Sequence, residues 1–226
     1  MQLAIDTSTD TASLALAQDS RVLAEFTWRC GQNHTTQLLP NLDYILKQLQ
    51  VNPQSLTAII VARGPGSFNG LRVGISTAKG LAFSLGIPIV GVSSLAVEAY
   101  QYAETGLPVC PVFNAGRGEI ATALYQKKRD DWCQLVAEHI TTVETLCSGI
   151  TTKTIFCGEF VPSIAPQLKK LLKQRALIMS PIAALRRAGF LAELGLKRLQ
   201  AANYDNLATL QPLYLRRPSI TRAKHR

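Results

Sequence analysis

The chain has 226 residues, of which 47% are hydrophobic and 17% are charged, and its formal net charge is +9. This composition excludes a disordered chain, and the length allows one large domain or two smaller lobes. No segment approaches the roughly 20 apolar residues that span a bilayer, and the first residues lack the basic region of a signal peptide. We therefore expect a cytoplasmic protein that does not bind a membrane.

The charge is distributed unevenly along the chain. Residues 1–165 contain 11 basic and 13 acidic side chains, whereas residues 166–226 contain 13 basic and 2 acidic side chains. Such an excess predicts an anionic partner for the C-terminal quarter. Its densest part, 216–226, is interpreted either as a solvated tail or as a segment that contacts RNA phosphates or an acidic protein surface.

Strands and helices alternate in the first half of the sequence. Two short strands, 2–5 and 12–17, enclose an oxygen-rich turn over residues 6–11 and predict a β-hairpin. The elements that follow are a strand over 22–27, a helix over 35–50, a strand over 56–62, a helix over 71–85, a strand over 87–92 and a helix over 93–102. The apolar run over 56–62 is typical of a strand buried on both faces of a parallel sheet, which predicts an α/β protein.

The helix predicted over 35–50 carries a wide apolar stripe. The stripe is formed by Leu38, Leu42, Ile45 and Leu49, and Leu39 and Leu46 widen it. A stripe of this width would contact a sheet on one side and a second helix on the other.

A glycine-rich segment joins the strand at 56–62 to the next helix. Backbone N–H groups near Gly64, Gly66 and Ser67 would favour phosphate at a helix N-terminus. The segment is not a Walker A loop, because no Gly-Lys-Ser/Thr follows, and its glycines are spaced one residue too far apart for a dinucleotide fingerprint. The alternative is a tight turn in which Ser67 or Asn69 caps the helix.

The helix after this segment has a face almost without side chains. Gly70, Gly74 and Ala78 recur every four residues, and each glycine inside a helix costs roughly 1 kcal/mol relative to alanine. The cost predicts that something packs very close to this face: the sheet, a second helix or another subunit.

The second half of the sequence repeats the pattern faintly. Strands are predicted over 109–113, 120–125 and 155–157, and helices over 164–174 and 183–202. The turn 114–119 matches the turn 6–11 in length when Asn114 is placed on Asp6, which predicts two similar lobes.

The sequence GPGSFNGLR at residues 64–72 resembles the GPGSFTGLR signature of the TsaB (YeaZ) family. Further matches to the family lie at 5–8, 78–82 and 212–216, so the resemblance extends over nearly the whole chain. It implies an actin-like ATPase (ASKHA) fold, an α/β architecture of two lobes, each with a mixed five-stranded sheet flanked by helices. The expected boundaries are 1–104 and 105–215, followed by the basic tail 216–226. The chain departs from the family pattern at Asn69, where threonine is usual, and at Asn114, where many members have aspartate.

The resemblance implies a non-catalytic scaffold or regulatory subunit. Such subunits bind the catalytic subunit TsaD, are joined by the small ATPase TsaE, and form homodimers when alone. The assembly transfers a threonylcarbamoyl group to N6 of adenosine 37 in tRNAs that read ANN codons. The resemblance implies no cofactor of the chain's own, with ATP or ADP at the partner interface and tRNA bound indirectly or through the basic C-terminal region. The implied interface consists of the first-lobe helices, with Leu38, Leu42, Ile45, Leu49, Gly70, Leu71, Gly74, Ala78 and Leu81.

Three other functions are less well supported by the sequence. A metal-dependent peptidase of the TsaD type needs two histidines four residues apart, but Leu38 stands four residues after His34, which we interpret as a surface or capping residue. An actin-like ATPase would need carboxylates in both hairpin turns, and Asp6 is matched by the neutral Asn114. A stand-alone RNA-binding protein would carry RRM, KH or zinc-knuckle motifs, and none is present.

The number of cysteines is odd, and no two of them are spaced as a CxxC pair. The five are Cys30, Cys110, Cys133, Cys147 and Cys157. This spacing predicts free, mostly buried thiols rather than disulfides or a zinc site.

Overall fold

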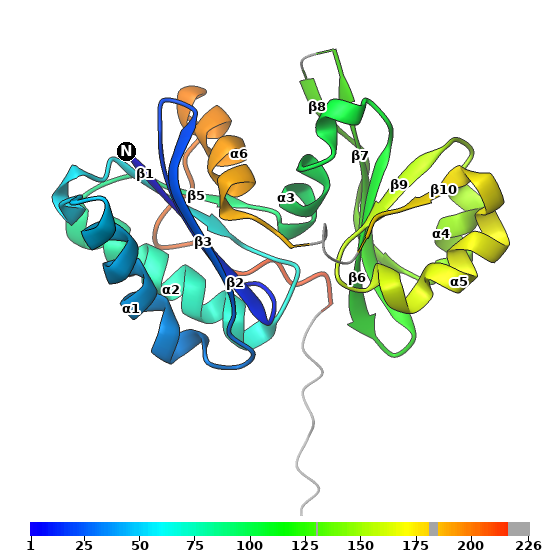
Figure 1. The fold of residues 1–226 in the computed structure, drawn as a ribbon, viewed down its shortest axis with the longest axis horizontal. Coiled ribbons are helices and arrows are strands. Elements are labelled where there is room, and N and C mark those ends of the chain that lie inside the picture. The colour runs from blue at the N-terminus through cyan, green and yellow to red at the C-terminus, as the bar shows by residue number, and fades with distance from the viewer. Residues whose placement is uncertain (130, 181–184, 217–226) are drawn as a thin grey trace, which may run out of the picture.

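The chain folds into two lobes, and each lobe is built on a five-stranded mixed sheet (Figure 1). The computed structural model describes residues 1–129, 131–180 and 185–216. The predicted basic tail, apart from Arg216, lies outside the described residues.

The first sheet consists of β1 (Gln2–Asp6), β2 (Thr11–Gln18), β3 (Arg21–Arg29), β4 (Ala58–Ala62) and β5 (Ile89–Val92). Its strand order is β3-β2-β1-β4-β5. β1 and β2 pair antiparallel, as do β2 and β3, whereas β4 runs parallel to β1 and to β5. Every residue of β4 is buried, as its continuous apolar sequence predicted, because helices cover both faces of the sheet.

The helices that cover this sheet are α1 (His34–Gln48), α2 (Phe68–Leu85) and α6 (Ala188–Gln200). α1 and α2 lie on one face, where their apolar side chains form a core with Leu3 and Ile5 of β1. α6 lies on the opposite face, where Leu191 packs with Ala4 and Ile60. Successive residues of β1 therefore serve two different cores, as the alternation of side chains along a strand requires.

The second sheet consists of β6 (Val109–Gly116), β7 (Glu119–Lys128), β8 (Asp131–Thr141), β9 (Thr154–Cys157) and β10 (Ala176–Ile178). Its strand order is β10-β9-β6-β7-β8. The β6–β7 and β7–β8 pairs are antiparallel, and β9 runs parallel to β6 and β10. This pairing repeats that of the first sheet, so the predicted internal repeat and the actin-like fold class are confirmed.

The second sheet also has helices on both faces. α4 (Val143–Gly149) and α5 (Val161–Leu172) contribute to the core on one face, which includes Phe156. α3 (Ser94–Tyr100) lies between the lobes, where Leu95 and Ala99 pack with Phe113 on the other face. Short 3-10 helices lie at Pro53–Ser55, Ala103–Thr105 and Lys173–Arg175.

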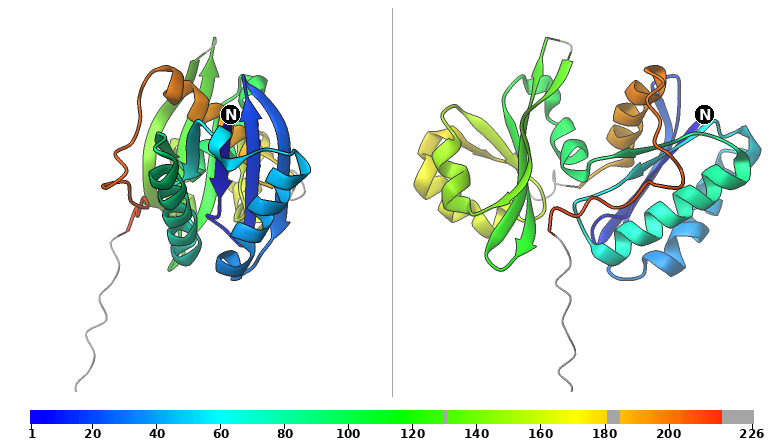
Figure 2. Two further views of the ribbon diagram at one scale, coloured as in Figure 1. Left: turned by 90° about the vertical axis from the view of Figure 1, so that its left-hand side faces the viewer. Right: turned by 180° about the vertical axis from the view of Figure 1, so that it is seen from behind.

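The structure corrects the expected lobe boundaries. The range 105–215 was assigned to the second lobe, but α6 lies within it and packs on the first sheet. The segment after α6 also returns to the first lobe, because Lys79 of α2 donates to the carbonyls of Ala208 and Leu210. Figure 2 shows this segment running beside the first lobe and reaching the space between the lobes.

Several elements were not predicted from the sequence, namely β8, α4 and β10. β8 is an edge strand with bulges in its pairing to β7, and most of it is exposed or half-buried, so no regular apolar pattern marks it.

The five cysteines are free and four of them are buried, as predicted. Among the described residues, no helix combines the length and hydrophobicity needed to cross a membrane.

Candidate functional site

The first part of the turn between β1 and β2, residues 6–9, is buried and hydrogen-bonded within the chain. Asp6, Thr7 and Ser8 are each at most 1% exposed. Asp6 Oδ1 accepts hydrogen bonds from the Ser8 amide at 2.9 Å and from the Ser8 hydroxyl at 2.5 Å. The Thr7 hydroxyl donates to the Gly70 carbonyl of α2 at 2.8 Å. The oxygen-rich turn predicted from the sequence is therefore an internal junction between the sheet and α2.

A buried arginine completes the hydrogen bonding of this turn. Arg186 Nε donates to Asp6 Oδ2 at 2.6 Å, and Nη2 donates to the Ser8 hydroxyl at 2.8 Å. Arg186 Nη1 lies 3.7 Å from Glu98 Oε2 of α3, and the guanidinium carbon lies 5.0 Å from the centre of the Phe113 ring. No sequence pattern pointed to Arg186, because 180 positions separate it from Asp6 and no motif joins them.

Burial and charge determine the protonation of this cluster. Burial raises the pKa of the Glu98 carboxyl to about 7, and Arg186 offsets that effect only in part. Burial lowers the pKa of Arg186, but Asp6, Glu98 and Glu159 more than compensate, so its pKa lies above the ordinary value. The arginine is therefore a permanent cation in this cluster, whereas Glu98 gains or loses a proton near neutral pH.

The glycine-rich segment packs directly on the same turn. The Ser67 amide donates to the Ser8 carbonyl at 2.7 Å, and the Ser67 hydroxyl accepts from the Gly70 amide at 3.3 Å. Ser67 is thus the N-cap of α2, as one alternative predicted. A Cβ at Gly66 would lie 2.2 Å from the Ser8 carbonyl oxygen, and one at Gly64 would lie 2.9 Å from that of Leu213. Close backbone approach within the chain explains both glycines.

The face of α2 without side chains also has its partner inside the chain. A Cβ at Gly70 would lie 2.1 Å from the Thr7 carbonyl oxygen, and one at Gly74 would lie 2.2 Å from the Thr7 hydroxyl. Ala78 is fully buried. The first of the predicted alternatives, close packing on the sheet, is confirmed for this face.

Most of the predicted interface residues therefore lie in the interior. Leu71 and the stripe residues Leu38, Leu42 and Ile45 are buried, with at most 4% of each exposed. Leu49 and Leu81 are partly buried against the same core. The prediction that this set docks on a partner is wrong for its buried members, because they contact their own sheet, together with Gly70, Gly74 and Ala78.

His34 differs from its predicted surface or capping role. It is 4% exposed, and its Nε2 atom lies 2.6 Å from the Thr9 carbonyl oxygen. The ring thus ties the start of α1 to the β1–β2 turn. Within the described residues, no group of three or more His, Cys, Asp or Glu side chains is arranged to hold a metal ion.

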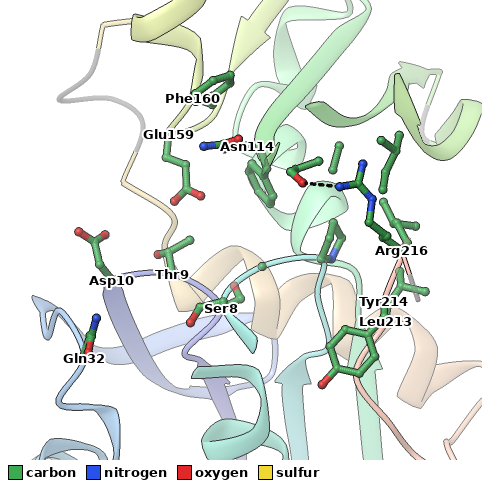
Figure 3. A pocket seen from close by; sticks show the side chains of 18 of the residues that line it. Ser8, Thr9, Asp10, Gln32, Asn114, Glu159, Phe160, Leu213, Tyr214 and Arg216 are labelled. Atoms are coloured by element: carbon green, nitrogen blue, oxygen red, sulfur yellow. Dashed lines mark hydrogen bonds between the residues drawn. The ribbon is translucent and has the colours of Figure 1, made fainter. Parts of the chain in front are cut away.

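A cavity of about 860 Å³ lies between the lobes beside this cluster (Figure 3). Asp10 of the first lobe and Glu159 of the second face each other across it. Gly66 and Ser67 line the cavity, whereas Gly64 is covered by Leu213. Other residues that line it are Ser8, Thr9, Phe113, Asn114, Phe160, Tyr214 and Arg216.

The actin-like fold implies a magnesium nucleotide between the lobes, but the residues present do not fit one. Both carboxylate oxygens of Asp6 are engaged by Ser8 and Arg186, so this carboxylate is not available as a direct ligand for Mg²⁺. The Ser67 amide is engaged by the Ser8 carbonyl and is not free for a phosphate. Asp10 and Glu159 add negative charge to the wall, which disfavours a phosphate that carries no metal ion.

Comparisons with known proteins agree with this architecture. The family model described as TsaD, tRNA N6-adenosine threonylcarbamoyltransferase, matches residues 28–224. A Bacillus subtilis relative named tRNA threonylcarbamoyladenosine biosynthesis protein TsaB is 34% identical over 95% of this chain and 93% of its own length. The chain belongs to the TsaB (YeaZ) family.

Other TsaB-family proteins support the assignment. The Escherichia coli relative of the same name is 39% identical over 55% of this chain and 54% of its own length. The structure of YeaZ from Pseudomonas aeruginosa superposes with a TM-score of 0.81 at 25% identity, covering 94% of this chain and 99% of that chain. The ethanolamine utilization protein EutJ from Carboxydothermus hydrogenoformans, with a TM-score of 0.50 at 11% identity and coverage of 84% of this chain and 88% of that chain, shares the fold alone.

Proposed function

We propose that this chain is a non-catalytic subunit in the biosynthesis of threonylcarbamoyladenosine in tRNA. It binds a TsaD-type transferase and supports threonylcarbamoylation of N6 of adenosine 37 in tRNAs that read ANN codons. The support for the pathway is membership of the TsaB family over nearly the whole chain. The support for a non-catalytic role is chemical: the carboxylate of the first turn is fully engaged by other side chains of the chain.

The docking surface that we propose is the exposed side of α1 and α2. A groove of about 350 Å³ runs between the two helices, and its lining includes Thr35, Leu39, Arg72, Val73, Ser76 and Thr77. Leu39 is 54% exposed, and Phe83 near the end of α2 is 78% exposed. We infer that these two exposed apolar side chains belong to the surface that the partner covers.

Gly80 is the single observation that carries the docking proposal. It lies inside α2 on the exposed side, and a Cβ built there would meet nothing within 4 Å. A glycine at such a position costs about 1 kcal/mol relative to alanine. Gly70 and Gly74 are explained by Thr7, but nothing in the described part of the chain explains Gly80. A helix of a partner that packs closely against α2 would require it.

The proposed assembly follows from this surface. The TsaD-type transferase covers α1 and α2, a second copy of the chain covers them when the transferase is absent, and TsaE joins the pair. Because the interlobe cavity does not suit a magnesium nucleotide, any ATP or ADP contacts this chain at the subunit junction. tRNA reaches it through the transferase or through the basic C-terminal region.

The test uses purified chain, TsaD and TsaE, with modified adenosine on tRNA as the readout. The full mixture is expected to modify tRNA, and omission of the chain is expected to abolish the product. Unchanged modification without the chain would reject the function, and turnover of a peptide or of ATP by the chain alone would reject the non-catalytic role.

The interface is tested separately with Gly80→Leu. The side chain points to open space, so the variant is expected to fold, but it should fail to co-purify with TsaD because the helices cannot approach. Gly149→Leu is the matched control, since its Cβ also meets nothing within 4 Å but lies on the second lobe. Recovery of TsaD with Gly80→Leu at the yield of the control would reject this surface.

A further inference from the structure

Arg186 is a buried cation at the junction of the two lobes. Its side chain is 6% exposed, and the side chains of Asp6 and Glu98 are each 2% exposed. Burial of charge at this level is unfavourable unless the charges are paired and hydrogen-bonded. Here the guanidinium has an acceptor on Asp6, a second on Ser8 and the carboxyl of Glu98 nearby.

The groups around Arg186 come from three separate parts of the fold. Asp6 and Ser8 belong to the β1–β2 turn of the first lobe. Glu98 belongs to α3, which packs against the second sheet, and its carbonyl lies 3.8 Å from the Cys157 thiol at the end of β9. Phe113 belongs to β6 and presents its ring to the guanidinium, an arrangement that attracts a cation. One side chain therefore connects both lobes.

Arg186 lies at the position where this chain differs from the nucleotide-binding members of its fold family. Where a nucleotide-binding member would direct a carboxylate of the first turn toward a hydrated metal ion, Asp6 directs Oδ2 at Arg186 and Oδ1 at Ser8. A guanidinium carries a permanent charge and offers donors in a fixed fork, so it satisfies the carboxylate without a ligand. The charge that a metal would supply is thus part of the polypeptide.

We propose that Arg186 is a built-in counter-ion that holds the two lobes at one fixed angle and takes the place of a bound magnesium nucleotide between them. A side chain of the protein itself, rather than a bound ligand, holds the lobes together. The molecule therefore does not open and close with nucleotide. This inference does not rest on the proposed partner, since every group that carries it belongs to the isolated chain.

The test is amide hydrogen exchange on the isolated full-length chain. In Arg186→Gln, exchange in residues 6–11 and 157–160 is expected to rise about tenfold or more, while β4 and β9 retain the wild-type protection. The matched control is Arg187→Gln, which removes the neighbouring arginine. Arg187 forms an ion pair with Glu25, and its side chain is 57% exposed. Its exchange pattern should equal that of the wild type.

Two further measurements keep the inference open to refutation. If Arg186→Gln does not fold, Arg186→Lys replaces it, and its single ammonium group is expected to protect residues 6–11 less than the wild type does. Magnesium and ATP together are expected to leave the exchange of the wild-type chain unchanged. Wild-type protection of both segments in the folded variant, or protection of residues 6–11 by magnesium and ATP in the wild type, would overturn the proposal.

Discussion

The two lobes share one strand order, and in each an arginine from the C-terminal part of the chain pairs with an acid of the first hairpin. In the first lobe Arg186 pairs with Asp6, and the two side chains are 6% and 2% exposed. In the second lobe Arg216 pairs with Glu119, and the side chains are 34% and 36% exposed. The same ion-pair chemistry is therefore structural in one lobe and superficial in the other, because burial determines how much a charge depends on its partner.

The two hairpin turns differ in the same sense. Thr7 and Ser8 lie under α2 and the glycine-rich segment, whereas Asn114 is exposed and its side chain accepts a local hydrogen bond from the Gly116 amide. The backbone conformation after the corresponding strands β4 and β9 is nevertheless shared, because Gly64 and Gly158 both have φ of +106°. Topology is thus repeated, while the packing over each turn is not.

The largest effect is expected from Arg186→Gln. It leaves the carboxylate of Asp6 buried without its cation, which should lower the free energy of unfolding by about 3–5 kcal/mol. Urea unfolding of the isolated chain measures the loss. The combined variant Asp6→Asn with Arg186→Gln should lose less than the two single variants added together. Additive losses would show that the two side chains are not coupled.

A smaller loss is expected from Gly74→Ala. The added Cβ would lie 2.2 Å from the Thr7 hydroxyl, so α2 must move away from the turn, at a cost of about 1–3 kcal/mol. Gly80→Ala is the control, because its Cβ meets nothing, and it should gain up to about 1 kcal/mol. Thermal unfolding of both variants gives the comparison, and equal shifts of the two would contradict the assigned packing.

The pH dependence of stability reports on Glu98. Its pKa is about 7 in the folded chain and its ordinary value is 4.5, so the folded state holds the extra proton between these values. Stability from this group is therefore full below pH 4.5 and declines as the pH rises to 7, by at most about 1.4 kcal/mol per pH unit. Glu98→Gln should remove this decline, and parallel curves for variant and wild type would refute it. The groups that face Glu98 are Arg186, Asp6, Glu159, Gln101, Tyr102 and Cys157.

The smallest effect is expected from Arg216→Gln. Its pair with Glu119 is about one-third exposed, so water replaces the lost partner and the cost should stay below about 1 kcal/mol. Urea unfolding in parallel with Arg186→Gln completes the comparison of the lobes. A loss equal to that of Arg186→Gln would mean that burial does not separate the two pairs.

The uneven charge of the sequence finds part of its explanation inside the chain. The C-terminal quarter was predicted to bind an anionic partner, and some of its arginines pair with acids of the same molecule. Arg186, Arg187 and Arg216 pair with Asp6, Glu25 and Glu119 of the acidic first part of the chain. Sequence position alone could not reveal this, because the pairs are between 97 and 180 residues apart.

Local patterns predicted what local forces control. The apolar run of β4, the stripe of α1 and the cap at Ser67 follow from side-chain periodicity and backbone hydrogen bonding within a few residues, so they were readable in order along the chain. The faint match of two hairpins was enough to predict the repeated lobe. Edge strand β8 was missed because exposed strands need no regular apolar pattern.

Tertiary structure decided which helix faces and side chains are buried and which groups contact them. The face of α2 formed by Gly70, Gly74 and Ala78 indicated a close contact, but only the folded chain showed that Thr7 and the sheet pack against this face. Arg186 had no signal at all, since a charge acquires its role from the burial and the acceptors that distant segments bring to it. Periodicity is a property of neighbours in the chain, whereas burial and charge pairing are properties of neighbours in space.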